Sequence, residues 1–206
     1  MPLTKWVLLG VLIVLVILVL VPVVVTQIEN YQARENEQRL QQSLLTSNPA
    51  NTTAVIVFSR SGNTAVLARH IANQEQADFY RLEAPDYKLG LKGWINAMWD
   101  ARQGEAVITP ATIDLSAYDT IYLGSPIWLY SPAPPIWQFV ENNRFDGKDV
   151  VLFNTFNSQF KQEFIDTFRQ QILAKGAKSF AHRFVQRGRM GQQISIDVML
   201  QRFEDQ

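Results

Sequence analysis

The chain has 206 residues, with 19 basic and 19 acidic side chains, and 47% of its residues are hydrophobic. This length accommodates one full domain and a shorter additional segment. Because the formal net charge is zero, the composition offers no excess of basic charge for nucleic acid, and no such partner is expected. The absence of cysteine excludes disulfides and thiolate metal sites, and the presence of only two histidines argues against a histidine metal site.

The first segment of the chain is strongly apolar. Residues 6–28 carry no charged side chain, and Val7 to Val25 is almost entirely valine, leucine and isoleucine. About 20 such residues in a helix, at about 1.5 Å each, cross a hydrocarbon core of about 30 Å. We therefore predict a transmembrane helix at residues 6–28 that contacts membrane lipid. A cleaved signal peptide is the alternative, although its apolar core usually has about 7 to 15 residues.

The next segment, residues 29–52, is polar and rich in glutamine, glutamate, asparagine and arginine. We predict a partly helical stalk here, ending in a turn at Ser47–Asn51. The folded domain is then expected to occupy residues 53–206.

Within the domain, apolar strand patterns alternate with helical patterns, which is typical of a parallel sheet covered on both faces. Strands are predicted at Ala54–Phe58, Asp78–Leu82, Thr120–Gly124, Val150–Asn154 and Ser179–Val185. Helices are predicted at Thr64–Asn73, Leu91–Arg102, Ala133–Asn142, Lys161–Lys175 and Ile194–Phe203.

A loop of small polar residues separates the first strand of the domain from the first helix. It contains Ser59, Ser61, Asn63 and Thr64. The unpaired amides and positive dipole end of a helix N-terminus can hold a phosphate together with such hydroxyl groups. The sequence lacks G-x-x-x-x-G-K-[ST] and G-x-G-x-x-G, so neither an ATP- or GTP-binding loop nor a dinucleotide loop is expected.

This loop resembles the FMN phosphate loop of the flavodoxin family, whose pattern is [ST]-x-[ST]-G-[NQ]-T. The resemblance implies a doubly wound, five-stranded α/β sheet with strand order 2-1-3-4-5 and FMN at the carboxyl ends of the strands. The phosphate-binding residues that it implies are Ser59, Arg60, Ser61, Gly62, Asn63 and Thr64.

A second segment supports the same resemblance. The stretch from Tyr118 to Pro135 is similar to the flavodoxin pattern Y-D-x-[IV]-x-[LIV]-G-x-P-[IV]-[WY]. An aromatic residue at stacking distance suits the flat flavin ring, and Trp128 is the first choice and Tyr130 the second. Core packing of either side chain is the alternative. The residues expected beside the ring are Pro126, Ile127, Trp128, Leu129 and Tyr130.

The third loop, residues 154–160, departs from the family because it contains no glycine. Thr155 and Asn157 are expected to hydrogen-bond the pyrimidine edge of the flavin. Phe156 or Phe160 either covers the ring or fills the domain interior. Without glycine the main chain is less free to approach the ring.

Three further features carry weaker expectations. Trp94, Met98 and Trp99 lie close together on one predicted helix and are expected to pack in the core. Arg183, Arg187 and Arg189 are expected on a solvated surface; contact with an NADPH phosphate or with anionic lipid is the alternative. His182 is assigned no catalytic role.

Together with the apolar segment, the resemblance implies a membrane-anchored FMN redox protein, acting in electron transfer or in NAD(P)H- or quinone-linked oxidoreduction. Its partner would be a redox protein, NAD(P)H or a quinone, and no catalytic base or nucleophile is needed because the flavin supplies the electron chemistry. A flavin-free module that assembles a membrane complex is the alternative.

We expect a single-pass protein of a bacterial inner membrane. Its orientation stays open because Lys5 and the terminal amine on one side nearly balance Arg34 and Arg39 on the other. The basic N-terminal tail favours export of the domain, whereas the supply of reduced nicotinamide favours the cytoplasm.

Overall fold

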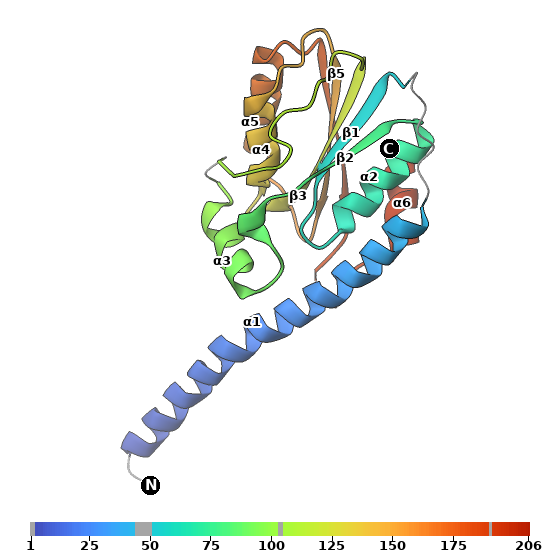
Figure 1. The fold of residues 1–206 in the computed structure, drawn as a ribbon. Coiled ribbons are helices and arrows are strands. Elements are labelled where there is room, and N and C mark those ends of the chain that lie inside the picture. Colours follow the sequence, from blue (N-terminus) through green and yellow to red (C-terminus); the bar gives the residue numbers. More distant parts are fainter. Residues whose placement is uncertain (1–2, 44–50, 103–104, 190) are drawn as a thin grey trace.

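The computed structural model describes residues 3–43, 51–102, 105–189 and 191–206. Its centre is a twisted sheet whose long strands are all parallel and run in the order β2-β1-β3-β5-β6 (Figure 1). The long strands are β1 (Thr53–Phe58), β2 (Asp78–Leu82), β3 (Thr120–Trp128), β5 (Asp149–Phe156) and β6 (Ser179–Gln186). Counted among themselves, the five long strands have the predicted order 2-1-3-4-5, so the predicted flavodoxin-like sheet is confirmed.

Helices cover both faces of this sheet (Figure 1). The helices are α1 (Leu3–Gln42), α2 (Asn63–Gln74), α3 (Leu91–Asp100), α4 (Pro134–Asn142), α5 (Gln162–Ala174) and α6 (Ile196–Glu204), with a short 3-10 turn at Pro85–Tyr87. All five helices predicted within the domain are present, with ends that differ by one or two residues.

The buried side chains form two clusters, one on each side of the sheet. In β1, Ile56 and Phe58 face the cluster that includes α4 and α5, whereas Val55 and Val57 face the cluster that includes α2 and α6. A central parallel strand needs apolar residues at successive positions because both of its faces are covered. The run of apolar residues in β1 therefore accounts for its central place.

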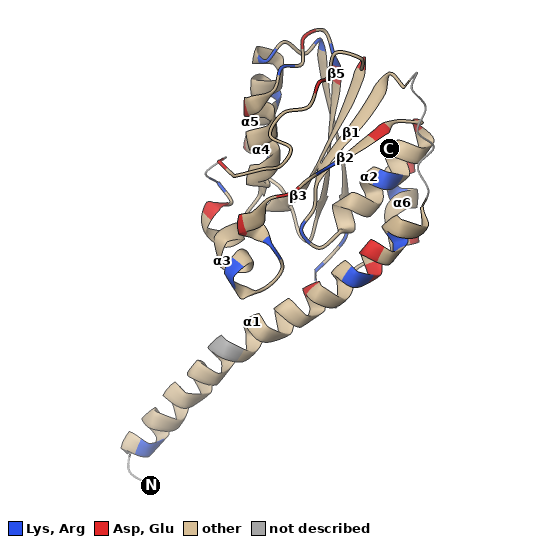
Figure 2. Cartoon of the chain, viewed as in Figure 1, with Lys and Arg blue, Asp and Glu red and all other residues tan. Residues whose placement is uncertain are grey.

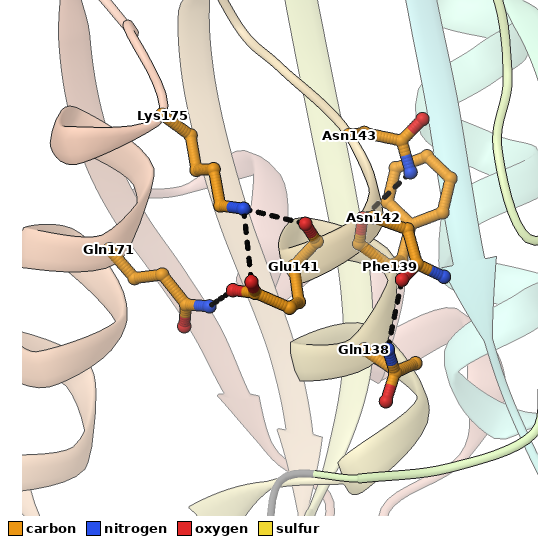
Figure 3. Close-up of polar contacts among 7 residues, drawn as sticks. All are labelled: Gln138, Phe139, Glu141, Asn142, Asn143, Gln171 and Lys175. Atoms are coloured by element: carbon orange, nitrogen blue, oxygen red, sulfur yellow. Dashed lines mark hydrogen bonds and ion pairs between the residues drawn. The ribbon is translucent and has the colours of Figure 1, made fainter.

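Polar contacts join the ends of α4 and α5 at the edge of the domain (Figure 3). Lys175 Nζ donates to the backbone oxygen of Glu141 at 2.6 Å, and Gln171 Nε2 donates to Glu141 Oε2 at 2.8 Å. The Lys175 ammonium holds the pKa of the Glu141 carboxyl below its usual value. Asn143 Nδ2 donates to the Phe139 oxygen at 2.7 Å and helps to end α4. The two bonds to Glu141 join α5 to α4.

Helix α1 is continuous from Leu3 to Gln42 and includes both the apolar segment and most of the polar segment. Lys5 lies near its start, and residues 6–28 carry no charge. Figure 2 shows acidic and basic residues where the helix reaches the domain. In its C-terminal part, Asn36 and Leu40 are buried against the domain. The polar segment thus packs on the domain as a helix rather than standing free as a stalk. Asn36 bonds to the loop before α2 and to its first residue, and Leu40 packs with apolar side chains of α2. Most of the predicted turn at Ser47–Asn51 lies outside the described residues.

The structure differs from the sequence prediction at β3, which extends four residues beyond Gly124 to Trp128. There it forms a hairpin with the two-residue strand β4 (Ser131–Pro132). Leu129 and Tyr130 form the turn, with φ of 42° and 78°. Positive φ at both central residues is the geometry of a type I′ turn, and it is unusual for residues other than glycine, asparagine and aspartate.

Candidate functional site

The carboxyl ends of β1, β3, β5 and β6 converge on one cavity of about 130 Å³. Eleven of the fourteen predicted site residues line it: Ser59, Arg60, Ser61, Asn63, Thr64, Pro126, Ile127, Trp128, Thr155, Phe156 and Asn157. Two further residues, Glu29 of α1 and Arg187 after β6, also line it. The cavity lies between β1 and β3, where the strand order reverses and where ligands bind in open α/β sheets.

The loop from β1 to α2 forms the floor of this cavity. Gly62 has a φ of 86°, a conformation that side chains rarely adopt, and it precedes the first residue of α2. Among the described residues no side chain caps the first amides of α2. Those amides are therefore available to an anion at the positive end of the helix.

Two hydroxyl groups meet beside the loop. Thr64 Oγ1 and Thr155 Oγ1 are 2.7 Å apart, and both residues are buried. The structure thus brings Thr155, which the sequence analysis assigned to the flavin ring, to the phosphate loop. Ser59 is also buried and lines the same cavity, so three hydroxyl side chains gather at the N-terminus of α2.

Helix α1 forms one wall of the site. Asn36 Nδ2 donates to the Ser61 backbone oxygen at 2.8 Å and to Asn63 Oδ1 at 2.9 Å. Further toward the N-terminus, the Glu29 carboxylate pairs with the Arg60 guanidinium. The other carboxylate oxygen of Glu29 is buried and has no hydrogen-bond partner in the described part of the chain. The segment predicted as a stalk therefore contributes directly to the cavity.

Arg187, which the sequence predicts on a solvated surface, also lines the cavity. Its side chain is buried rather than solvated, so the expectation of a surface position is wrong. Its Nη1 contacts the sulfur of Met199 at 3.6 Å, and its Nε finds no hydrogen-bond partner among the described residues. Burial lowers the pKa of Arg187 below its usual value, and the nearby Arg39 lowers it further. A buried guanidinium whose Nε has no partner in the described chain, on a residue that lines a cavity, is suited to bind an anion.

Trp128 lies at the cavity within an aromatic cluster. Its ring meets Phe58 edge to face, with centroids 5.5 Å apart, and meets Tyr87 in the same way at 5.3 Å. These contacts orient the indole at the cavity wall, so Trp128 both packs against the core and lines the cavity.

The structure does not bring Gly62, Leu129 or Tyr130 into the lining of the cavity. Gly62 shapes the loop through its backbone. Leu129 and Tyr130 form the hairpin turn, where the Lys161 ammonium lies 5.8 Å from the centroid of the Tyr130 ring. Tyr130 therefore faces α5 rather than the cavity lined by Trp128.

The third loop follows β5, which continues through Phe156. Phe156 is buried and packs near Phe160 and Phe184, with ring centroids 5.5 and 5.7 Å away. Although it also lines the cavity, much of its surface is covered by these rings, so it serves mainly to fill the domain here. Asn157, the next residue, lines the cavity beside it.

His182 belongs to the same aromatic region. Its Nε2 donates to Asn154 Oδ1 at 2.9 Å, since Asn154 Nδ2 already donates to the Ser125 oxygen at 2.7 Å. Burial lowers the pKa of His182 from 6.5 to about 4.

This lowered pKa predicts an acid sensitivity of the fold. The unfolded chain takes up the His182 proton near pH 6.5, whereas the folded chain resists it down to about pH 4. The contribution of His182 to stability is thus fully present above pH 6.5 and is lost as the pH falls from 6.5 toward 4. We expect the thermal unfolding midpoint to fall less over this range in His182→Gln than in the unaltered protein. Equal pH dependence in both proteins would contradict this assignment.

Comparison with known proteins identifies the fold. A family model described as Flavodoxin matches residues 52–179. A putative flavoprotein from Bacteroides uniformis superposes with a TM-score of 0.55 at 22% identity, covering 75% of this chain and 98% of that one. A putative flavoprotein from Bacteroides eggerthii gives 0.52 at 18% identity, covering 75% and 96%.

A flavoprotein from Lactobacillus acidophilus, solved in complex with FMN, gives a TM-score of 0.51 at 22% identity, covering 64% of this chain and 93% of that one. A search of curated proteins found no match. The model match spans more than half of the chain, from the start of β1 to the start of β6. This chain therefore belongs to the flavodoxin family.

Proposed function

We propose that the protein is a membrane-anchored FMN flavoprotein that transfers electrons. The observation that carries this proposal is the cavity at the N-terminus of α2, which is lined by the hydroxyl residues Ser59, Thr64 and Thr155 and by the buried Arg187. The Lactobacillus acidophilus protein of similar fold was solved with FMN, which supports the choice of ligand.

The donors at this cavity fit a phosphate group. Free amides at a helix N-terminus and hydroxyl side chains hold a phosphate through hydrogen bonds, and Arg187 adds the positive charge that a dianion favours. Its Nε has no partner among the described residues, so a phosphate would satisfy a group that is otherwise costly to bury.

The flavin ring would lie beyond the phosphate loop, toward the ends of β3 and β5. Trp128 presents an aromatic surface there, and Asn157 presents amide groups for the ring edge. Bound FMN would supply the electron transfer itself, and the protein would bind and orient it. A redox protein, NAD(P)H or a quinone would be its electron partner.

The apolar part of α1 supports membrane anchoring. Helix α1 is long and apolar enough to cross a membrane, with a mean hydropathy of 3.5 over its most apolar window, and none of the described side chains of that window is buried. A helix that exposes leucine, isoleucine and valine on all its sides is unstable in water and stable in lipid. The mass of the mature protein in membranes would distinguish a retained anchor from a cleaved signal peptide.

The visible spectrum of the full chain, purified in mild detergent, tests the proposal. We expect yellow protein that releases FMN when denatured. Colourless protein that does not bind added FMN would refute FMN binding and favour a flavin-free module. If the flavin is present, anaerobic NAD(P)H will bleach it directly in an oxidoreductase, whereas a carrier will need a partner protein.

The phosphate loop predicts a difference between FMN and riboflavin, which lacks the phosphate. Ser59→Ala combined with Thr64→Ala removes two hydroxyls from the cradle, and hydrogen bonds to charged groups contribute about 1.5 to 3 kcal/mol each. We therefore expect FMN affinity to fall by about 100-fold or more and riboflavin affinity to change little. Thr167→Ala, on the exposed side of α5, is the control. Equal losses for both ligands in a titration would show that the loop does not bind the phosphate.

A further inference from the structure

Helix α3 has an arrangement of side chains opposite to that of an ordinary surface helix. Its buried positions are the small residues Gly93 and Ala97, and Ala101 follows them at the same spacing. Four of its large apolar residues, Leu91, Ile95, Met98 and Trp99, are exposed, Trp99 to 80%, whereas Trp94 is partly buried. These four positions follow a spacing of four, three and one, so they form one face of the helix. The core packing expected for Met98 and Trp99 is therefore wrong.

This face lies beside the point where the apolar part of α1 ends. Arg60 pairs with Glu29, the first charged residue after the apolar segment, and its Nη2 donates to the Gly90 oxygen at 3.1 Å. Gly90 immediately precedes α3. One side chain therefore connects the end of the apolar segment to the start of α3.

The two helices are also in direct contact. Figure 1 shows α3 beside the middle of α1, at the end of the domain nearest the N-terminal half of that helix, whereas α2 and α6 lie beside its C-terminal part. The exposed residues of α3 therefore lie near the level at which the apolar segment of α1 meets its polar continuation.

We infer that the exposed face of α3 lies in the membrane interface, with lipid as its partner. The inference depends on the membrane anchor of the proposed function, because α1 brings α3 to the bilayer. Burial of four large apolar side chains in the interface removes them from water, and tryptophan is enriched at this depth. Lys88 and Lys92 are exposed next to this face and can extend to lipid headgroups.

Continuity with α1 favours lipid over a protein partner. Exposed apolar residues occur on both helices, and Leu89 and Leu129 extend the apolar surface beyond α3. This second contact would orient the domain, so that the cavity lined by Glu29 lies at the membrane surface. A lipid-soluble electron acceptor such as a quinone would then reach the cavity without leaving the bilayer.

The absence of native cysteine allows a direct test with single spin labels on the full chain in lipid nanodiscs. Met98→Cys reports on α3, and Leu173→Cys on α5 is the matched control, because the two native side chains are 42% and 43% exposed. Val14→Cys reports separately on the anchor, and Trp99→Cys gives a second position on α3. Collisions with oxygen, which concentrates in lipid, are compared with those of a water-soluble nickel chelate.

We expect labels at positions 98 and 99 to collide more with oxygen than with nickel, and the label at 173 to show the reverse. A lipid signal at 14 with a water signal at both 98 and 99 would refute the role of α3 while retaining the anchor. Protection of 98 and 99 from both reagents would indicate a protein contact and would also refute it. A water signal at 14 would refute the anchor itself, and the inference with it.

Discussion

Replacing Arg187 with glutamine should weaken FMN binding by about 10- to 100-fold and leave riboflavin binding nearly unchanged, because a charge-assisted hydrogen bond contributes about 1.5 to 3 kcal/mol. Arg187 is buried at the cavity and its Nε has no partner among the described residues. A phosphate would thus be its main partner, and riboflavin has none to offer.

The same substitution should not destabilise the protein without flavin. Burial and Arg39 both lower the pKa of Arg187, which means that its charge is unfavourable when no anion is bound. We expect the thermal unfolding midpoint of flavin-free Arg187→Gln to equal or exceed that of the unaltered protein. Arg189→Gln, two residues further on and exposed, is the control. A loss of stability with unchanged FMN affinity would identify Arg187 as a structural residue.

Replacing Gly62 with alanine should both weaken FMN binding by at least about 10-fold and release the C-terminal part of α1 from the domain. The residue has a φ of 86°, where an L side chain costs about 1 to 2 kcal/mol. A methyl group at Gly62 would also lie 2.6 Å from Asn36 Cβ on α1. Either the loop or the helix has to move, and both contribute to the cavity.

Hydrogen exchange of the backbone amides of α1 and a titration with FMN measure these two effects. Gly147→Ala is the matched control, because Gly147 has a φ of 71° and a methyl group there would meet no atom of the described chain within 4 Å. The Gly147→Ala variant therefore has the backbone strain of Gly62→Ala without a contact to α1. If α1 exchanges equally in both variants, the contact between Gly62 and Asn36 does not couple the anchor to the flavin site.

The sequence predicts the sheet, the five helices of the domain and the phosphate loop, because each depends on neighbouring residues. The apolar run of β1 needs burial on both faces, and Gly62 allows the turn that starts α2. Eleven of the fourteen predicted site residues line the cavity because parallel strands bring their carboxyl ends to one edge.

The remaining features depend on contacts between distant parts of the chain. Tyr130 lies outside the cavity because it forms a hairpin turn with Leu129. Both residues have positive φ there, a conformation that leucine and tyrosine disfavour. Glu29 lines the cavity although the apolar segment before it indicates only a membrane helix. Helical spacing continues past residue 28 and indicates that Glu29 and Asn36 belong to the same helix. This spacing does not show which surface the helix meets.

The sequence by itself determined the family and the fold class and predicted a phosphate loop between Ser59 and Thr64, since these follow from local patterns of apolar, small and polar residues. Only the tertiary structure decided that Arg187 is buried at that loop and that α1 forms one wall of the site. It also decided that α3 exposes its large side chains. Burial and charge pairing depend on which surfaces meet in space, and residues far apart in the chain acquire these properties only when the helices pack.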